Sequence, residues 1–328
     1  MLLWSVWEVA FVLVASSAVA VAVMALERLS WRRLKSNDDF VREVRVGFLG
    51  NSIQYFNDLP RVLEAMLVSQ RIRLRHVCCF RGGASLKSLA EKGNGVRGEM
   101  GASAKTIAEV FESGPLDFCV LNDFTQAPAR LASRAVGLET LLRSYAPLVA
   151  KNGCVPIFLS TYSYRKHAKH SEDIGSIPDD FTKKLDDGYE AYALALTAAL
   201  PNKKQRPRVA RVGAAFKTVH DERPDIWHNL FFDDDFHPSP LGTYLQACVL
   251  YCVITGKAPP TFPTSKGDVI KLWQHARYMQ PPSAKGAPCR LPTPNECSYL
   301  RDVATRVVLD QRSRGAAALA PTAWQTML

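Results

Sequence analysis

Short apolar runs along this chain alternate with longer segments in which apolar residues recur every three or four positions. The runs have the length and composition of buried β-strands, and they cover residues 44–49, 73–80, 117–121, 155–160 and 209–215. Helical periodicity lies between them, at residues 59–70, 85–91, 104–112, 129–150 and 181–200. Strands that alternate with helices are typical of a mainly parallel sheet with right-handed crossover connections. The pattern therefore predicts an α/β domain built on a five-stranded sheet.

A further helix is predicted after a polar loop that contains three consecutive aspartates. Ser239 is a suitable N-cap for it, and Pro240 occupies its first turn. Gly256 ends it. Residues 41–260 therefore make up the predicted sheet domain. The remaining residues, 261–328, are rich in Pro and Ala with one helix expected near residues 298–310, and we expect them to form a C-terminal appendage.

The chain begins with a segment that has the features of a membrane span. Residues 9–26 contain no charged residue, and they are about long enough to cross the hydrocarbon core of a bilayer. Tryptophans flank this segment, as interfacial residues do, and basic residues follow it. Because the start is not basic and Glu8 precedes the apolar core, we favour a retained single-pass anchor and linker in residues 1–40 over a cleaved secretion signal. A buried N-terminal helix is a further alternative.

Composition excludes several classes of protein. Of the 328 residues, 47% are hydrophobic and 22% are charged, which is ordinary for a globular chain and excludes a wholly disordered one. The net charge of +10 favours anionic surfaces. It does not form one long basic run, and no recognition motif accompanies it, so nucleic-acid binding is not expected.

The eight cysteines do not have the spacing of a zinc site or of a CxxC motif. Six of them lie inside apolar runs, where we expect buried thiols that behave as small hydrophobes. Cys289 and Cys297 lie in the Pro-rich tail, and they could form a disulfide in an oxidising compartment. No metal site is expected from this pattern.

The turn after the first predicted strand carries a hydroxyl group. Gly50 and Asn51 end that strand, and Ser52 follows at the carboxyl edge of the sheet, where open α/β folds place their chemistry. A serine hydroxyl needs a base to remove its proton and a third group to orient the base. His237 is a suitable base, because Asp234 precedes it by three residues in a tight loop. The sequence therefore predicts Ser52, His237 and Asp234 as nucleophile, base and orienting acid.

Acyl transfer also needs hydrogen-bond donors directed at the developing oxyanion. The backbone N–H of Ser52, the backbone N–H near Gly83 and the side-chain amide of Asn122 could supply three. Each of these residues follows a different predicted strand, so the carboxyl ends of a parallel sheet would bring them together.

These residues fall in four blocks that resemble those of the SGNH/GDSL hydrolase superfamily. Residues 50–52 resemble the first block, residues 82–85 the second, residues 121–123 the third, and residues 234–237 the Asp-x-x-His of the fifth. The resemblance covers roughly residues 44–256. It implies a flavodoxin-like three-layer α/β/α sandwich and a Ser52–His237–Asp234 triad. It also implies oxyanion donors at Ser52, Gly83 and Asn122.

The chain departs from the family pattern at two positions. The first block usually has an aspartate where this chain has Asn51; that acid is not the nucleophile, so we expect activity to survive. The third block usually has a glycine where this chain has Val120, which changes the surroundings of the oxyanion pocket. Further residues near the site are predicted as possible substrate contacts. They are Asn51, Gly82, Asp123, Tyr162 and Tyr164, and the last two could equally be packed aromatic side chains.

A polar segment after the fourth predicted strand contains His167 and His170. With Glu172 and Asp173 these residues could imitate a metal site, but an ordinary polar loop explains them better, because metal ligands need a fixed geometry. Residues 93–101 are rich in glycine without a phosphate-binding pattern, so no nucleotide is implied. We expect no metal and no organic cofactor.

The first functional hypothesis is a serine esterase that hydrolyses carboxylic esters of a small molecule, a carbohydrate or a lipid, with a short acyl group such as acetyl implied by the resemblance. A membrane-tethered O-acyltransferase with the same site is the second hypothesis. A catalytically inactive protein that binds glycans is the third, and the complete triad argues against it. The basic residues after the apolar segment favour a cytoplasmic domain, whereas many esterases are secreted, so the side of the membrane stays open.

Overall fold

The computed structural model describes residues 40–96, 104–166, 172–276 and 290–310. The predicted membrane anchor, residues 1–39, therefore lies outside the described residues. Within the described ranges, none of the helices combines the length and the apolar character that a bilayer crossing requires.

Five parallel strands form the centre of the fold. They are β1 (Arg42–Gly50), β2 (Ile72–Phe80), β3 (Phe118–Leu121), β4 (Val155–Leu159) and β5 (Arg208–Ala210). Their order across the sheet is β2-β1-β3-β4-β5, and every neighbouring pair is parallel. The predicted five-stranded parallel sheet is confirmed. All five strands end at the same edge of the sheet, and the loops that follow them meet there.

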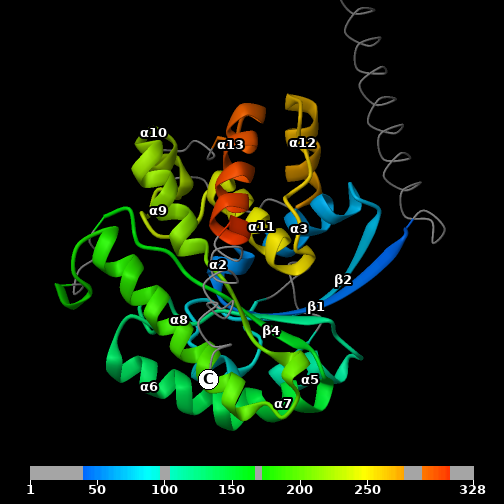
Figure 1. The fold of residues 1–328 in the computed structure, drawn as a ribbon, viewed down its shortest axis with the longest axis vertical. Coiled ribbons are helices and arrows are strands. Elements are labelled where there is room, and N and C mark those ends of the chain that lie inside the picture. Colours follow the sequence, from blue (N-terminus) through cyan, green and yellow to red (C-terminus); the bar gives the residue numbers. More distant parts are fainter. Residues whose placement is uncertain (1–39, 97–103, 167–171, 277–289, 311–328) are drawn as a thin grey trace, which may run out of the picture.

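Helices cover both faces of the sheet (Figure 1). On one face lie α3 (Leu59–Val68), α9 (Val212–Glu222), α10 (Pro224–Trp227), α11 (Pro240–Thr255), α12 (Lys266–His275) and α13 (Pro294–Thr305). On the other lie α5 (Ile107–Glu112), α6 (Leu131–Thr140), α7 (Ala146–Asn152) and α8 (Asp179–Ala199). The short helices α2 (Ser52–Tyr55) and α4 (Leu86–Lys92) follow β1 and β2. A π-helical turn, Leu141–Tyr145, joins α6 to α7.

Each strand contributes alternate side chains to the two faces, as a pleated strand must. In β3, Phe118 and Val120 belong to the core beneath α3 and α11, whereas Cys119 and Leu121 belong to the core beneath α5, α7 and α8. Both cores are apolar, and this double burial explains why the strands read as continuous apolar runs. The six cysteines predicted to be buried, in the strands, before β4 and in α11, are buried in the structure.

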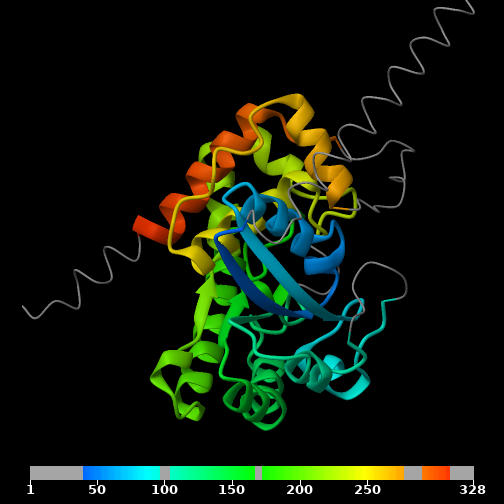
Figure 2. The same ribbon diagram turned by 90° about the vertical axis from the view of Figure 1, so that its right-hand side faces the viewer.

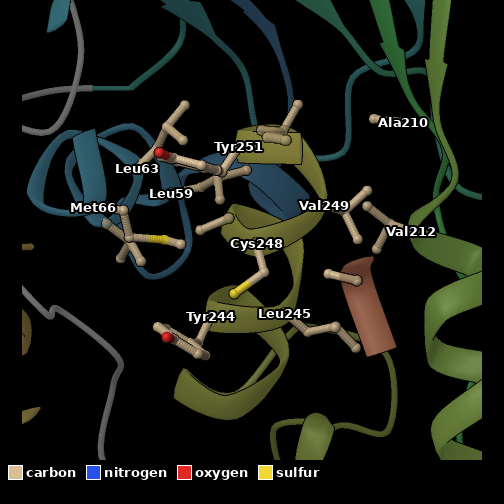
Figure 3. Packing of buried hydrophobic residues seen from close by; sticks show 14 of the residues in the cluster. Leu59, Leu63, Met66, Ala210, Val212, Tyr244, Leu245, Cys248, Val249 and Tyr251 are labelled. Atoms are coloured by element: carbon tan, nitrogen blue, oxygen red, sulfur yellow. The ribbon is translucent and has the colours of Figure 1, made fainter. Parts of the chain in front are cut away.

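The helix α11 is the most enclosed element, since all its residues from Pro240 to Ile254 are buried. A helix that is apolar on every side needs neighbours on every side. Figure 3 shows α11 side chains, among them Tyr244 and Cys248, packed beside Met66 of α3. Because α11 directly follows His237, this packing fixes the position of the loop that carries the histidine.

The fifth strand is shorter than predicted. The sequence assigns residues 209–215 to a strand, but β5 ends at Ala210 and α9 begins at Val212. Val212, Ala215, Phe216 and Val219 are buried at helical spacing. The apolar run is continuous across both elements, so its composition alone does not mark the change from strand to helix.

Residues 261–276 and 290–310 pack on the sheet domain. The structure has the helix α12 where none is predicted, and α13 begins at Pro294. Both lie on the face of the sheet opposite to α5, α6 and α7 (Figure 1 and Figure 2). Cys297 and Leu300 of α13 are fully buried in the same core as α11. Cys289, the other cysteine of the tail, lies outside the described residues.

Candidate active site

Ser52 is the first residue of α2, directly after β1. A Cβ atom on Gly50 would lie 1.9 Å from Oδ1 of Asn122 and 2.4 Å from Nε2 of Gln54. The strand therefore has to end in glycine for these amides to approach the backbone. The result is a sharp turn that presents Ser52 at the carboxyl edge of the sheet.

Ser52, His237 and Asp234 lie next to one another although Ser52 and His237 are 185 positions apart. The Nε2 atom of His237 is 2.7 Å from Oγ of Ser52, and its Nδ1 atom is 2.6 Å from Oδ2 of Asp234. The second carboxylate oxygen, Oδ1, accepts the backbone N–H of His237 at 2.9 Å. The histidine can therefore exchange a proton with Ser52 while Asp234 holds its other nitrogen.

The carboxyl of Asp234 is well suited to stay ionised. Burial alone would raise its pKa, but hydrogen bonds from the ring and backbone of His237 more than offset this effect, so the pKa of Asp234 is lowered. The neighbouring Asp235 is bound by Arg165 and lies 3.4 Å from Nζ of Lys166. Asp233 is exposed, as the sequence predicts for an acid outside the triad.

A β-bridge and hydrogen bonds hold the two ends of the loop that carries His237. Phe231 and Pro238 form an antiparallel bridge, and the backbone N–H of Phe232 donates to the carbonyl of His237 at 2.8 Å. Asn57, just after α2, donates its amide to the carbonyl of Pro238 at 2.7 Å and to Oγ1 of Thr243 at 2.8 Å. This buried amide connects the nucleophile segment with the histidine loop.

Two of the three expected oxyanion donors belong to residues that line the cavity beside Ser52. They are Ser52 itself and Gly83. Gly83 has a φ of +62°, a left-handed conformation that favours glycine, and no atom lies within 4 Å of the position that its Cβ would take. Gly82, the preceding residue, is exposed but is not one of the lining residues among those described.

The third expected donor, Asn122, is engaged elsewhere. Its Nδ2 donates to Oδ1 of Asn51 at 2.9 Å and to the carbonyl of Asp123 at 3.0 Å. A primary amide nitrogen has two hydrogens, so both are used. Its Oδ1 accepts Nε2 of Gln54 at 2.7 Å, which fixes the orientation of the amide. Asn122 is 2% exposed and is not among the described residues that line the cavity.

The cavity beside Ser52 has a volume of about 460 Å³. Loops that follow different strands form its walls, which carry both polar and apolar side chains. Ile53, Phe124, Tyr164 and Phe236 supply the apolar lining. A volume of this size accommodates a small organic ligand.

Solved structures of other proteins match this fold. A DUF4886 family protein from Bacteroides uniformis matches 72% of this chain and 93% of its own length, with 16% identity and a TM-score of 0.56. A candidate SGNH hydrolase from Slackia heliotrinireducens matches 65% of this chain and 99% of its own length, with 24% identity and a TM-score of 0.47. A GDSL-like lipase from Bacteroides thetaiotaomicron matches 65% and 86%, with 14% identity and a TM-score of 0.36. No family model and no curated protein matches the chain.

This chain shares its fold with the DUF4886 family protein. Because the sequence identities of these matches are below 25%, they are evidence of a similar fold and not of a similar activity. The function therefore has to be argued from the site itself.

Two residues predicted as possible substrate contacts lie in the protein interior. Tyr162 is 1% exposed and stacks on Phe216 with a centroid separation of 3.9 Å. Asp123 is 1% exposed; its carboxylate accepts the backbone N–H groups of Leu86 and Phe124 at 2.9 and 2.8 Å and the hydroxyl of Tyr192 at 2.8 Å. Burial raises the pKa of Asp123. The structure brings neither side chain to the cavity.

Several residues of the site are not identified by sequence reasoning. Phe56 stacks on the ring of His237, and Lys166 and Phe124 line the cavity. Phe124 and Phe236 could have been suspected, since each adjoins a motif residue. Nothing in the sequence distinguishes Phe56 from other apolar residues near Ser52.

Metal binding is not supported in the part of the chain that the structure describes. None of its groups of three or more His, Cys, Asp or Glu side chains is arranged to hold a metal ion. His167 and His170, the pair considered from the sequence, lie outside the described residues.

Proposed function

We propose that this chain is a serine hydrolase of the SGNH/GDSL type that cleaves carboxylic esters. The observation that carries the proposal is the continuous hydrogen-bonded series from Ser52 through His237 to Asp234 at the end of an apolar cavity. Such a series is needed for nucleophilic catalysis by serine, whereas a binding module has no need of it. The shared fold and the names of the structural neighbours agree with this function.

In the first half of the proposed reaction, Oγ of Ser52 attacks the ester carbonyl while Nε2 of His237 takes the hydroxyl proton. Asp234 accepts the Nδ1–H and so stabilises the charged imidazole. The N–H groups of Ser52 and Gly83 donate to the oxyanion of the tetrahedral intermediate. His237 then returns its proton to the leaving alcohol, and an acyl group remains on Ser52.

In the second half, His237 removes a proton from water, and the resulting hydroxide equivalent attacks the acyl carbonyl. Collapse of the second intermediate releases the carboxylic acid and returns the proton to Ser52. The acyl group is proposed to be short, as the resemblance implies. Attachment to a membrane through residues 1–40 is likewise a proposal, and fractionation of cells that express the full chain would test it.

The test is hydrolysis of p-nitrophenyl acetate by the full-length chain. We expect turnover that Ser52→Ala reduces by at least ~10³-fold, because the nucleophile is lost. Ser298→Ala, at an exposed position of α13, is the matched control and should keep the wild-type rate. Turnover that survives Ser52→Ala would contradict the proposal. Turnover that requires a sugar acceptor would favour the alternative, an O-acyltransferase, and absence of any turnover would favour the glycan-binding alternative.

A further inference from the structure

We propose that Asn51 is a positioning residue whose side-chain amide joins the nucleophile turn to both loops that surround the oxyanion. The expected loss of catalytic rate rests on the proposed function, whereas the expected loss of thermal stability does not. It also implies that the aspartate usual at this position in the SGNH/GDSL superfamily would harm this chain.

The nitrogen of the Asn51 side chain connects two loops that are far apart in the sequence. Nδ2 donates to the carbonyl of Ala84 at 2.9 Å and to the carbonyl of Asp123 at 3.1 Å. Ala84 directly follows Gly83, and Asp123 is the second residue after β3. One amide group therefore holds the loops after β2 and β3 against the turn that carries Ser52.

The oxygen of the same side chain is fully used as well. Oδ1 accepts the backbone N–H of Ile53 at 3.1 Å and Nδ2 of Asn122 at 2.9 Å. Two hydrogens and two lone pairs are all that a primary amide offers, so Asn51 is saturated. Its orientation follows from its partners, because the reverse orientation would turn Oδ1 toward two carbonyl oxygens.

A carboxylate cannot replace this amide. With aspartate at position 51, the oxygen in place of Nδ2 would face the carbonyl oxygens of Ala84 and Asp123 with no hydrogen to share. Asn51 borders the cavity, but its side chain is nearly inaccessible to water, since the residue is 2% exposed. A buried charge that faces acceptors is strongly disfavoured, and its pKa rises as a result. Only the protonated acid could donate, and it could donate to one carbonyl alone.

The predicted consequence is a displacement of the Gly83 loop relative to Ser52. Gly83 and Ser52 carry the two donors that line the cavity, and loss or misplacement of one oxyanion donor costs about 10²–10³-fold in kcat. Ground-state binding would depend mainly on Tyr164 and Phe236, which line the cavity from loops to which the side chain of Asn51 makes no hydrogen bond among the described residues. We therefore expect kcat to fall far more than KM rises.

The experiment compares Asn51→Asp with the wild-type chain on p-nitrophenyl acetate from pH 5.5 to 9. We expect kcat at pH 8 to fall by at least ~100-fold, with KM changed less than about threefold. The ratio of variant to wild-type kcat should rise as the pH falls, because protonation of Asp at position 51 restores one donor. Because ionisation at position 51 also weakens folding, the rates are compared at a temperature at which both proteins are folded at every pH. Asn202→Asp is the matched control, since Asn202 is an exposed N-cap whose Oδ1 only accepts.

A second measurement, the melting temperature, needs no substrate. It therefore tests the inference even if the wild-type protein hydrolyses no ester, a result that would count against the proposed function alone. The melting temperature of Asn51→Asp should lie below that of the wild type, and the gap should widen as the pH rises and the carboxylate forms. If Asn51→Asp does not fold, Asn51→Ala should show the same loss of kcat without the dependence of the ratio on pH. A variant at position 51 with wild-type kcat, or an Asn51→Asp melting temperature equal to that of the wild type at pH 8, would overturn the inference.

Discussion

The imidazole of His237 contacts two phenylalanine rings that come from different parts of the chain. The ring of Phe56 is parallel to it, with a centroid separation of 4.2 Å and an angle of 6°. The ring of Phe236 lies at 4.1 Å and 41°. Neither ring competes for the nitrogens of the imidazole, so both nitrogens stay available for Ser52 and Asp234. The two rings therefore set the plane in which the proton is transferred.

Replacement of Phe56 by Ala should reduce kcat by roughly 3–10-fold, because an aromatic pair contributes about 0.5–1.5 kcal/mol to holding the imidazole in place. KM should change little, since Phe56 is not among the described residues that line the cavity. Steady-state kinetics on p-nitrophenyl acetate checks this. Phe40→Ala, at the opposite end of β1, is the matched control. An increase in KM at unchanged kcat would contradict the assignment.

Sequence reasoning at the residue scale works for some groups of the site and not for others. Ser52 could be predicted because it follows a strand of a parallel sheet, where such residues converge at one edge. His237 could be predicted because Asp234 precedes it by three residues in a tight loop. The hydrogen bonds of the Asn122 side chain could not be predicted, because they depend on which residues from distant parts of the chain lie beside its amide. The role of Asn57 in connecting the two segments cannot be predicted for the same reason, since its partners Pro238 and Thr243 are 181 and 186 positions away.

At the scale of elements, the contact between α8 and the start of α9 contains a carboxyl without a complete set of partners. Asp186 of α8 lies 3.7 Å from Arg211, the residue that precedes α9. Within the described part of the chain, its Oδ1 is buried and has no hydrogen-bond partner. Burial raises the pKa of Asp186 to about 6. The charged form is therefore disfavoured in the folded protein.

The pH dependence follows from the sign of that shift. The pKa in the folded state is about 6, whereas that of an unfolded aspartate is near 3.9. Folding is therefore weakened as the pH rises through this window and Asp186 ionises. Asp186→Asn removes the charge, so we expect its melting temperature to exceed that of the wild type by a few degrees at pH 8 and not at pH 4. Thermal unfolding at both pH values tests this.

Asp187→Asn provides the matched control. Asp187 is exposed and pairs with Lys183 on the surface, so its replacement should change the melting temperature little at either pH. A difference for Asp186→Asn that is the same at pH 4 and pH 8 would show that ionisation is not the cause.

The elements themselves could mostly be predicted, because strands buried on both faces and amphipathic helices leave distinct patterns. The boundary between β5 and α9 could not. Gly213, inside the apolar run, has no space for a side chain, since a Cβ atom would lie 2.7 Å from the carbonyl oxygen of Thr161. This contact lies in the first turn of α9 and depends on the tertiary structure, so the sequence alone does not show that the helix begins here.

At the scale of the whole molecule, the walls of the cavity come from loops that follow different strands and helices. Phe124 follows β3, Tyr164 follows β4, and Phe236 belongs to the loop before α11. The side chain of Phe124 is 42% exposed and lines the cavity together with Phe236, which is 39% exposed. Specificity for the acyl group should therefore depend on the ring of Phe124.

We expect p-nitrophenyl butyrate to be hydrolysed with a kcat/KM up to about 10-fold above that of the acetate, because each additional buried CH₂ contributes about 0.8 kcal/mol. Phe124→Ala should lower kcat/KM for the butyrate and leave that for the acetate nearly unchanged. Leu131→Ala, at a position that is 79% exposed on α6, is the control. An equal loss with both esters would show that Phe124 does not contact the acyl chain.

The C-terminal part of the molecule was the least predictable from sequence. Prolines and alanines suggest a peripheral segment, yet Leu272 and Trp273 of α12 are buried against α3. His275 binds Glu64 of α3 at 2.9 Å. Helices that pack on other helices gain most of their stability from that contact, so their own sequence indicates them only weakly.

The direction of β1 has a consequence for how this protein meets its surroundings. The chain enters the sheet at Phe40, and the reacting hydroxyl lies at the other end of a strand of nine residues, a separation of roughly 30 Å at about 3.3 Å per residue. Ser52 and the cavity that it lines therefore lie at the opposite end of β1 from Phe40. If residues 1–40 attach the chain to a membrane, as proposed, esters in solution would reach Ser52 more directly than esters embedded at that attachment.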